Sequence, residues 1–89
     1  MVLNDAEIAA VLRARVSTVT PQVFGYSAVS AAVMGLYALD ESSAARELRA
    51  WVDLWGGEIR WHTDRPAEIE LPSTSWDALQ ALPPPGEEL

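Results

Sequence analysis

Cysteine and lysine are both absent from this chain of 89 residues, and histidine occurs only once, as His62. Without cysteine, the chain can form neither a disulfide framework nor a thiolate metal site. A single histidine without clustered aspartates also provides no ligand set of the zinc or calcium-loop kind. The sequence therefore predicts no metal and no cofactor, and it leaves side-chain packing to hold the fold together.

Groups for catalysis are equally scarce. A hydrolytic triad would need His62 between a carboxylate and a serine nucleophile. Glu68 can face His62 across a pair of strands, but no nucleophile elbow and no glycine-rich phosphate loop is visible. Because no constellation supplies a nucleophile, a base and a stabilising group together, we expect a protein that is not an enzyme.

The net charge of −7 is unevenly distributed. Residues 1–42 carry two arginines and four acids, and residues 66–89 carry five acids and no base. Only residues 43–65 are balanced, with four arginines and four acids. An acidic chain repels nucleic acid unless it gathers arginine on one face, so nucleic acid is an unlikely partner and only the middle third could attract it.

Other compositional features bear on origin and location. All six basic residues are arginine and alanine is abundant, which is typical of a GC-rich bacterial or phage genome. No targeting segment is visible, so we expect a cytoplasmic protein.

Residues 21–39, PQVFGYSAVSAAVMGLYAL, carry no charged side chain, and the uncharged run extends back to Val16. Thr20 followed by Pro21 predicts a helix start there. One side of this helix is apolar and comprises Val29, Val33, Leu36 and Tyr37. A second side carries only small residues, Ser27, Ala31 and Gly35. We therefore expect the helix to be buried on most faces at the centre of the fold. Serine, glutamine and glycine dilute the run, which argues against a membrane span.

Three further helices are expected at 4–17, 42–55 and 75–82. Asn4 is a capping residue for the first, Asp40 or Ser42 for the second, and Thr74 for the last. The second of these helices has a clear apolar side at helical spacing, and Gly56-Gly57 ends it; that side comprises Leu48, Trp51, Val52 and Trp55.

Residues 58–63 and 68–71 alternate between polar and apolar side chains, which predicts an antiparallel hairpin. Matching the apolar faces pairs Trp61 with Ile69 and Ile59 with Leu71. The outer face then sets Arg60 opposite Glu70 and His62 opposite Glu68. Both strands of an isolated hairpin have an open edge, so we expect a possible homodimer through the hairpin edge.

The predicted fold class is therefore α+β, with three helices around the central apolar helix, an antiparallel β-hairpin and a short C-terminal helix. Residues 1–82 form one globular domain. The proline-rich acidic tail, 83–89, is expected to be disordered.

Two functions are compatible with this pattern. The first is a small acidic protein-binding module, such as an adaptor, an inhibitor or an immunity-like partner, which uses the hairpin and the adjacent helix. Its candidate partner-binding residues are Arg60, His62, Arg65, Glu68 and Glu70. The alternative rests on element order, which resembles that of a winged-helix DNA-binding regulator with helix 42–55 as reader and hairpin 58–71 as wing. Its candidate DNA-binding residues are Arg46, Arg49, Arg60 and Arg65.

Overall fold

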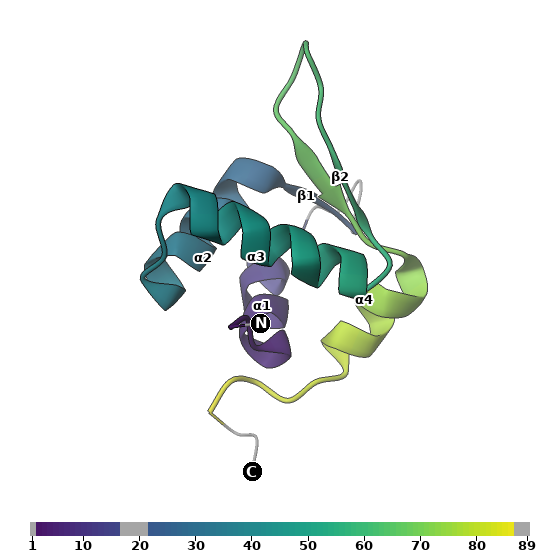
Figure 1. Ribbon diagram of the computed structural model, residues 1–89. Coiled ribbons are helices and arrows are strands. Elements are labelled where there is room, and N and C mark those ends of the chain that lie inside the picture. The colour runs from purple at the N-terminus through teal and green to yellow at the C-terminus, as the bar shows by residue number, and fades with distance from the viewer. Residues whose placement is uncertain (1, 17–21, 87–89) are drawn as a thin grey trace.

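The computed structural model describes residues 2–16 and 22–86 and confirms an α+β fold. Figure 1 shows the described helices gathered on one side of a small antiparallel sheet, from which a hairpin projects. In chain order the elements are α1 (Asp5–Arg13), β1 (Val23–Gly25), α2 (Tyr26–Tyr37), α3 (Glu41–Leu54), β2 (Glu58–Arg60), β3 (Glu68–Glu70) and α4 (Ser73–Gln80). None of the described helices is long and apolar enough to cross a membrane.

The sheet has the strand order β1-β3-β2, so β3 is its central strand. Ile69 of β3 lies opposite Phe24 of β1 on one side and Ile59 of β2 on the other. The hairpin is confirmed, but the pairing of Ile59 with Leu71 is wrong by two residues. The expectation that both hairpin strands have an open edge is also wrong, because β1 occupies the second edge of β3.

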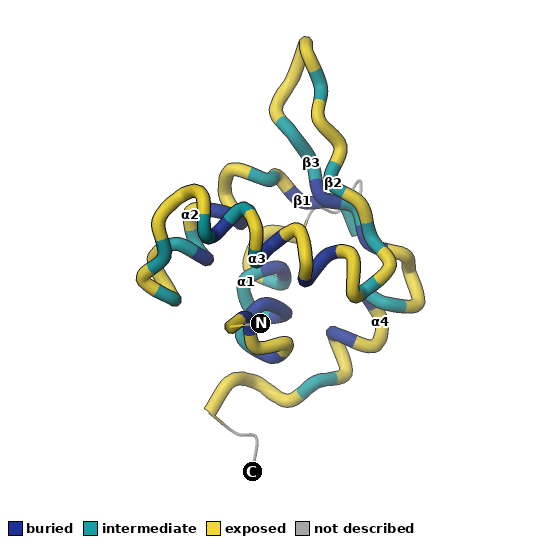
Figure 2. The backbone as a smooth tube through the Cα atoms, in the orientation of Figure 1, coloured by how far each residue is buried: buried dark blue, intermediate teal, exposed yellow. Residues whose placement is uncertain are grey.

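The core lies between the inner face of the sheet and the helices. Phe24 and Ile69 are buried on that face, and the Trp76 ring of α4 packs edge-on against Phe24, with 5.1 Å between ring centroids. Figure 2 shows how the buried side of α3 faces α1, while the far end of the hairpin is exposed. The helical residues that complete the core include Ile8, Ala9, Leu12, Val29, Val33, Ala44, Leu48, Trp51, Val52 and Leu79.

The uncharged stretch 21–39 does not form one continuous helix. Val23–Gly25 is a strand, and α2 begins at Tyr26. Thr20 and Pro21, the expected start of that helix, lie outside the described residues. Within α2 the side facing the core is narrow, since only Val29, Ser30 and Val33 are buried. The side of small residues is exposed and Leu36 is half exposed, so the expectation of a helix buried on most faces is wrong.

Side-chain hydrogen bonds explain where α1 and α3 begin. The Asn4 side chain accepts from the backbone N–H of Glu7 at 3.0 Å, as expected for the first helix. Asp40 accepts from the backbone N–H of Ser43 at 2.7 Å. Hydrogen bonds from the backbone and side chain of Ser43 hold the pKa of the Asp40 carboxyl below its usual value. The last helix follows Pro72 without a side-chain cap, so the expected cap at Thr74 is wrong. The first helix also ends earlier than expected, at Arg13.

Two polar contacts fasten α1 to the other helices. The Asp5 carboxylate accepts from the indole N–H of Trp51 at 2.8 Å and from that of Trp55 at 3.2 Å. The Tyr37 hydroxyl donates to Glu7 at 2.6 Å and accepts from the backbone N–H of Asn4 at 2.9 Å. Burial and the hydrogen bond to Glu7 raise the pKa of Tyr37 to about 12. Side chains near the start of α1 thus tie it to both α2 and α3.

The turn from α3 into the hairpin depends on two glycines. Gly56 has a left-handed backbone with φ of 74°, a conformation that favours glycine. At Gly57, an added Cβ would lie 2.6 Å from the carbonyl oxygen of Glu70 and 2.8 Å from Leu71 Cδ2. The close approach at Gly57 sets the first residue of β2 against β3 and fixes the angle at which the hairpin leaves the body.

Candidate functional site

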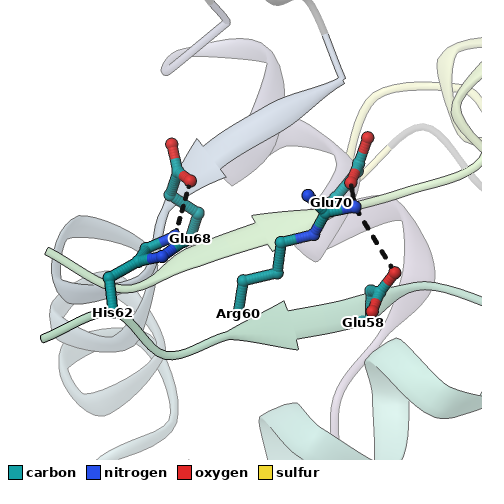
Figure 3. A network of polar contacts seen from close by, with 5 residues as sticks. All are labelled: Glu58, Arg60, His62, Glu68 and Glu70. Carbon is teal, nitrogen blue, oxygen red and sulfur yellow. Dashed lines mark hydrogen bonds and ion pairs between the residues drawn. The ribbon is translucent and has the colours of Figure 1, made fainter. Parts of the chain in front are cut away.

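The outer face of the hairpin carries a row of ion pairs (Figure 3). Arg60 contacts Glu70 across the strands and Glu58 on its own strand, the latter at 3.5 Å. His62 Nε2 lies 2.9 Å from a carboxylate oxygen of Glu68. Both cross-strand pairs expected from the sequence therefore form, although the register makes them diagonal neighbours. Adjacent diagonal positions remain within reach of long side chains, which reconciles the contacts with the shifted register.

This row brings together four of the five predicted partner-binding residues. The fifth, Arg65, is exposed in the loop between β2 and β3. Because Arg60 and His62 already face glutamates, much of their hydrogen-bonding capacity is used within the chain. Exposed pairs of this kind contribute about 0–1 kcal/mol each to stability.

A groove on the other side of the hairpin has more of the character of a binding site. It lies between α3 and β2, has a volume of about 480 Å³ and is lined by residues of three separate segments. We call it the α3–β2 groove. Its lining comprises Tyr26 at the start of α2, Ala45, Arg46, Arg49 and Asp53 on α3, and Glu58, Ile59 and Trp61 on and just beyond β2.

Trp61 is the exposed aromatic side chain of this groove. The strand alternation puts its side chain on the inner face with Ile59, as expected, but it is 69% exposed. Its expected pairing with Ile69 is wrong, because Ile69 lies opposite Ile59 and β2 ends at Arg60. The indole instead packs on Tyr26, with ring centroids 4.9 Å apart and an angle of 56° between the planes. We call these two rings, Tyr26 and Trp61, the aromatic shelf.

The charged residues of the groove are separated along its length. Arg46, Arg49 and Asp53 recur on one side of α3, since residues three and four apart share a helix face. Arg46 donates to the Ser43 hydroxyl at 3.3 Å, and within the described residues neither arginine lies within ion-pair distance of a carboxylate. Asp53 lies near the end where α3 turns into β2, and Glu58 begins that strand.

The two acids of the groove thus lie where α3 turns into β2, and Arg46, Arg49 and the aromatic shelf lie farther from that turn along the chain. The predicted DNA-binding residues are split by the hairpin, with Arg46 and Arg49 in the groove and Arg60 on the outer face. Sequence reasoning missed Tyr26 and placed Trp61 on the apolar face of the hairpin, paired with Ile69. The available signal was that Trp61 lies at the loop end of the first strand, where the helices need not extend beneath it.

The chemistry available in the groove is that of binding. Arginine guanidinium groups offer several donors to a carboxylate or phosphate, and aromatic faces accept apolar or cationic groups. No three metal-ligating side chains come together in the part of the chain that is described. Comparison of the chain with protein-family models, with curated proteins and with solved structures finds no match.

Proposed function

We propose that this protein is a non-catalytic protein-binding module and that the α3–β2 groove holds a segment of the protein it binds. The observation that carries the proposal is the aromatic shelf, in which an indole that is 69% exposed lies on Tyr26 beside Arg46 and Arg49. Tryptophan, tyrosine and arginine are the residues most enriched among those that dominate binding energy at protein interfaces.

The size and lining of the groove also favour a peptide segment. Its volume of about 480 Å³ falls in the range of pockets that enclose small ligands or a few side chains. A stable protein complex buries roughly 800 Å² on each partner, which is more than one groove of this size provides. The groove is therefore the anchor, and the exposed end of the hairpin extends the contact.

The proposal is tested by partner capture with two matched variants. Trp61 and Leu54 are almost equally exposed, at 69% and 70%, but only Trp61 lines the groove. We expect Trp61→Ala to weaken capture from an extract of the source organism by about 30-fold or more, as for an interface residue worth about 2 kcal/mol. Leu54→Ala should bind as the parent does. Equal capture by both variants would refute the assignment of the groove.

The second candidate function is DNA binding, and the arrangement of α3 and the hairpin favours it. A helix and a projecting hairpin flank one groove, as the reader and wing of a winged helix do, and the paired β1 extends that resemblance from element order to the sheet. Arg46 and Arg49 would face the phosphates. Against this, Asp53 and Glu58 line the same groove, and the whole chain carries a net charge of −7.

Retention on heparin or on a mixed DNA duplex at low salt separates the two functions. A DNA reader would be retained, with an affinity that falls steeply as salt rises because phosphate binding releases counterions. We expect the protein to flow through. Retention that Arg46→Ala and Arg49→Ala abolish together would favour the DNA reader.

A further inference from the structure

The order of chemical groups along the α3–β2 groove restricts what can fill it. The aromatic shelf of Tyr26 and Trp61 lines the groove together with Arg46 and Arg49, while the acids Asp53 and Glu58 lie nearest the turn from α3 into β2. A complementary segment therefore has a rigid apolar part for the rings, followed closely by carboxylates for the arginines. Grooves lined by aromatic side chains bind proline-rich segments because these are already extended and lose little entropy on binding.

The chain itself contains a segment with this order. Pro83, Pro84 and Pro85 are followed after Gly86 by two glutamates. Residues 83–86 are exposed and lie beyond Leu82, which packs against the core. In an extended proline-type conformation, residues 83–88 would span about 15 Å, compared with about 10 Å of α3 between Arg46 and Asp53. The segment is thus long enough to cover the groove.

Residues 83–86 do not lie in the groove of their own chain. Figure 1 shows the chain leaving α4 and running below α1, away from the hairpin. We propose that the α3–β2 groove binds the proline-rich acidic segment 83–88 of a second copy of this chain. This inference rests on the function proposed above for the groove. The prolines lie on the aromatic shelf, and the glutamates pair with Arg46 and Arg49.

Charge complementarity selects a second copy over an unrelated apolar segment. The two arginines lie in the only part of the chain whose charges balance, whereas residues 66–89 carry five acids and no base. Two copies that each carry −7 repel one another at long range. Moderate salt should therefore relieve the overall repulsion, while high salt should weaken the contacts between glutamate and arginine.

A peptide with the sequence of residues 81–89, ALPPPGEEL, tests the contact directly against the full-length protein labelled with ¹⁵N. We expect the indole N–H signal of Trp61 to shift on titration, and the signals of Trp51 and Trp76, which are buried, to stay in place. Peptides in which serine replaces the prolines, or glutamine replaces the glutamates, should bind at least about tenfold more weakly. Trp61→Ala should remove the response in the neighbouring backbone signals.

A charge exchange tests whether the contact joins two copies. The full chain should show a mass that rises with concentration in sedimentation or light scattering. Arg46→Glu with Arg49→Glu should make it monomeric, and Glu87→Arg with Glu88→Arg should do the same. An equimolar mixture of the two double variants should associate again, because each supplies the partner that the other has lost.

The outcomes separate this inference from the proposed function. If the peptide causes no shift while Trp61→Ala still loses partner capture, a segment of a different protein fills the groove, and the second-copy proposal is overturned. If the peptide binds but the chain stays monomeric at every concentration and the mixture does not associate, the segment does not join two copies. If neither the peptide nor partner capture depends on Trp61, both proposals fail.

Discussion

Two glycine-to-alanine substitutions should change stability in opposite directions. At Gly57, the new Cβ would lie 2.6 Å from the Glu70 carbonyl oxygen and 3.1 Å from Val52 Cγ1. At Gly35, which lies on the exposed side of α2, the new Cβ would meet no atom within 4 Å apart from its chain neighbours and the backbone of its own helix. The chemical change is the same, so the difference between the variants reports the packing around each position.

The cost at Gly57 follows from what it contacts. A contact of 2.6 Å is too short to persist, and the atom on the other side is backbone of β3, which is paired on both edges and cannot easily move. Overpacking of this kind costs about 1–3 kcal/mol. Replacing glycine also restricts the unfolded chain, which returns about 0.4–1 kcal/mol. Taken from the middle of both ranges, the net loss should be about 1–2 kcal/mol.

Gly35→Ala has no such clash and gains helix propensity, so it should stabilise the protein by about 0.5–1 kcal/mol. For a domain of this size, 1 kcal/mol shifts the melting temperature by about 4–8 °C. In thermal unfolding followed by circular dichroism, Gly57→Ala should therefore lower the melting temperature by about 4–16 °C, and Gly35→Ala should raise it by about 2–8 °C. A Gly57→Ala midpoint equal to or above that of the parent would refute the role assigned to the close approach.

Further predictions concern α2 and its contacts. Val33→Ala should cost about 2 kcal/mol in chemical unfolding because Val33 is fully buried, whereas Leu36→Ala should change stability by less than about 0.5 kcal/mol because Leu36 is half exposed; equal losses would contradict the assigned faces. Stability should fall as pH rises from 10 towards 12, because the unfolded chain releases the Tyr37 proton before the folded one does, and Tyr37→Phe should flatten that fall; an unchanged slope would contradict the raised pKa of Tyr37. Ala38→Gly should raise the melting temperature by about 2–8 °C, because Ala38 ends α2 with a φ of 54°; no rise would show that the left-handed turn is not strained.

Local patterns in the sequence were sufficient to predict α3 and the start of α1. Leu48, Trp51 and Val52 follow the period of a helix, and the Asn4 cap needs only the next three residues. Such features depend on neighbours in the chain, so they can be recognised before the fold is known. The strand β1 could not be recognised in this way, because Val23–Gly25 pairs with residues far along the chain and lies within an uncharged run typical of a helix.

In the hairpin, the alternation of polar and apolar residues determines only part of how the two strands pair. Alternation has a period of two, so it assigns the faces of Ile59 and Ile69 correctly but does not distinguish registers that differ by two residues. The candidate site was missed for a related reason. The pattern indicates the face on which Trp61 lies, but whether that face is covered depends on how far the helices extend beneath it.

The pairing of β1 with β3 has a consequence for synthesis on the ribosome. Phe24 and Ile69 are opposite one another although 45 positions separate them, and Trp76 of α4 then packs on Phe24. Contacts this far apart in sequence are slow to form because a long loop must be closed first. The nascent chain therefore lacks its sheet until β3 has left the exit tunnel, and it lacks the contact between Phe24 and Trp76 until α4 has followed. Truncation before α4 should yield an unfolded fragment, because the buried ring of Phe24 would lose its cover from Trp76.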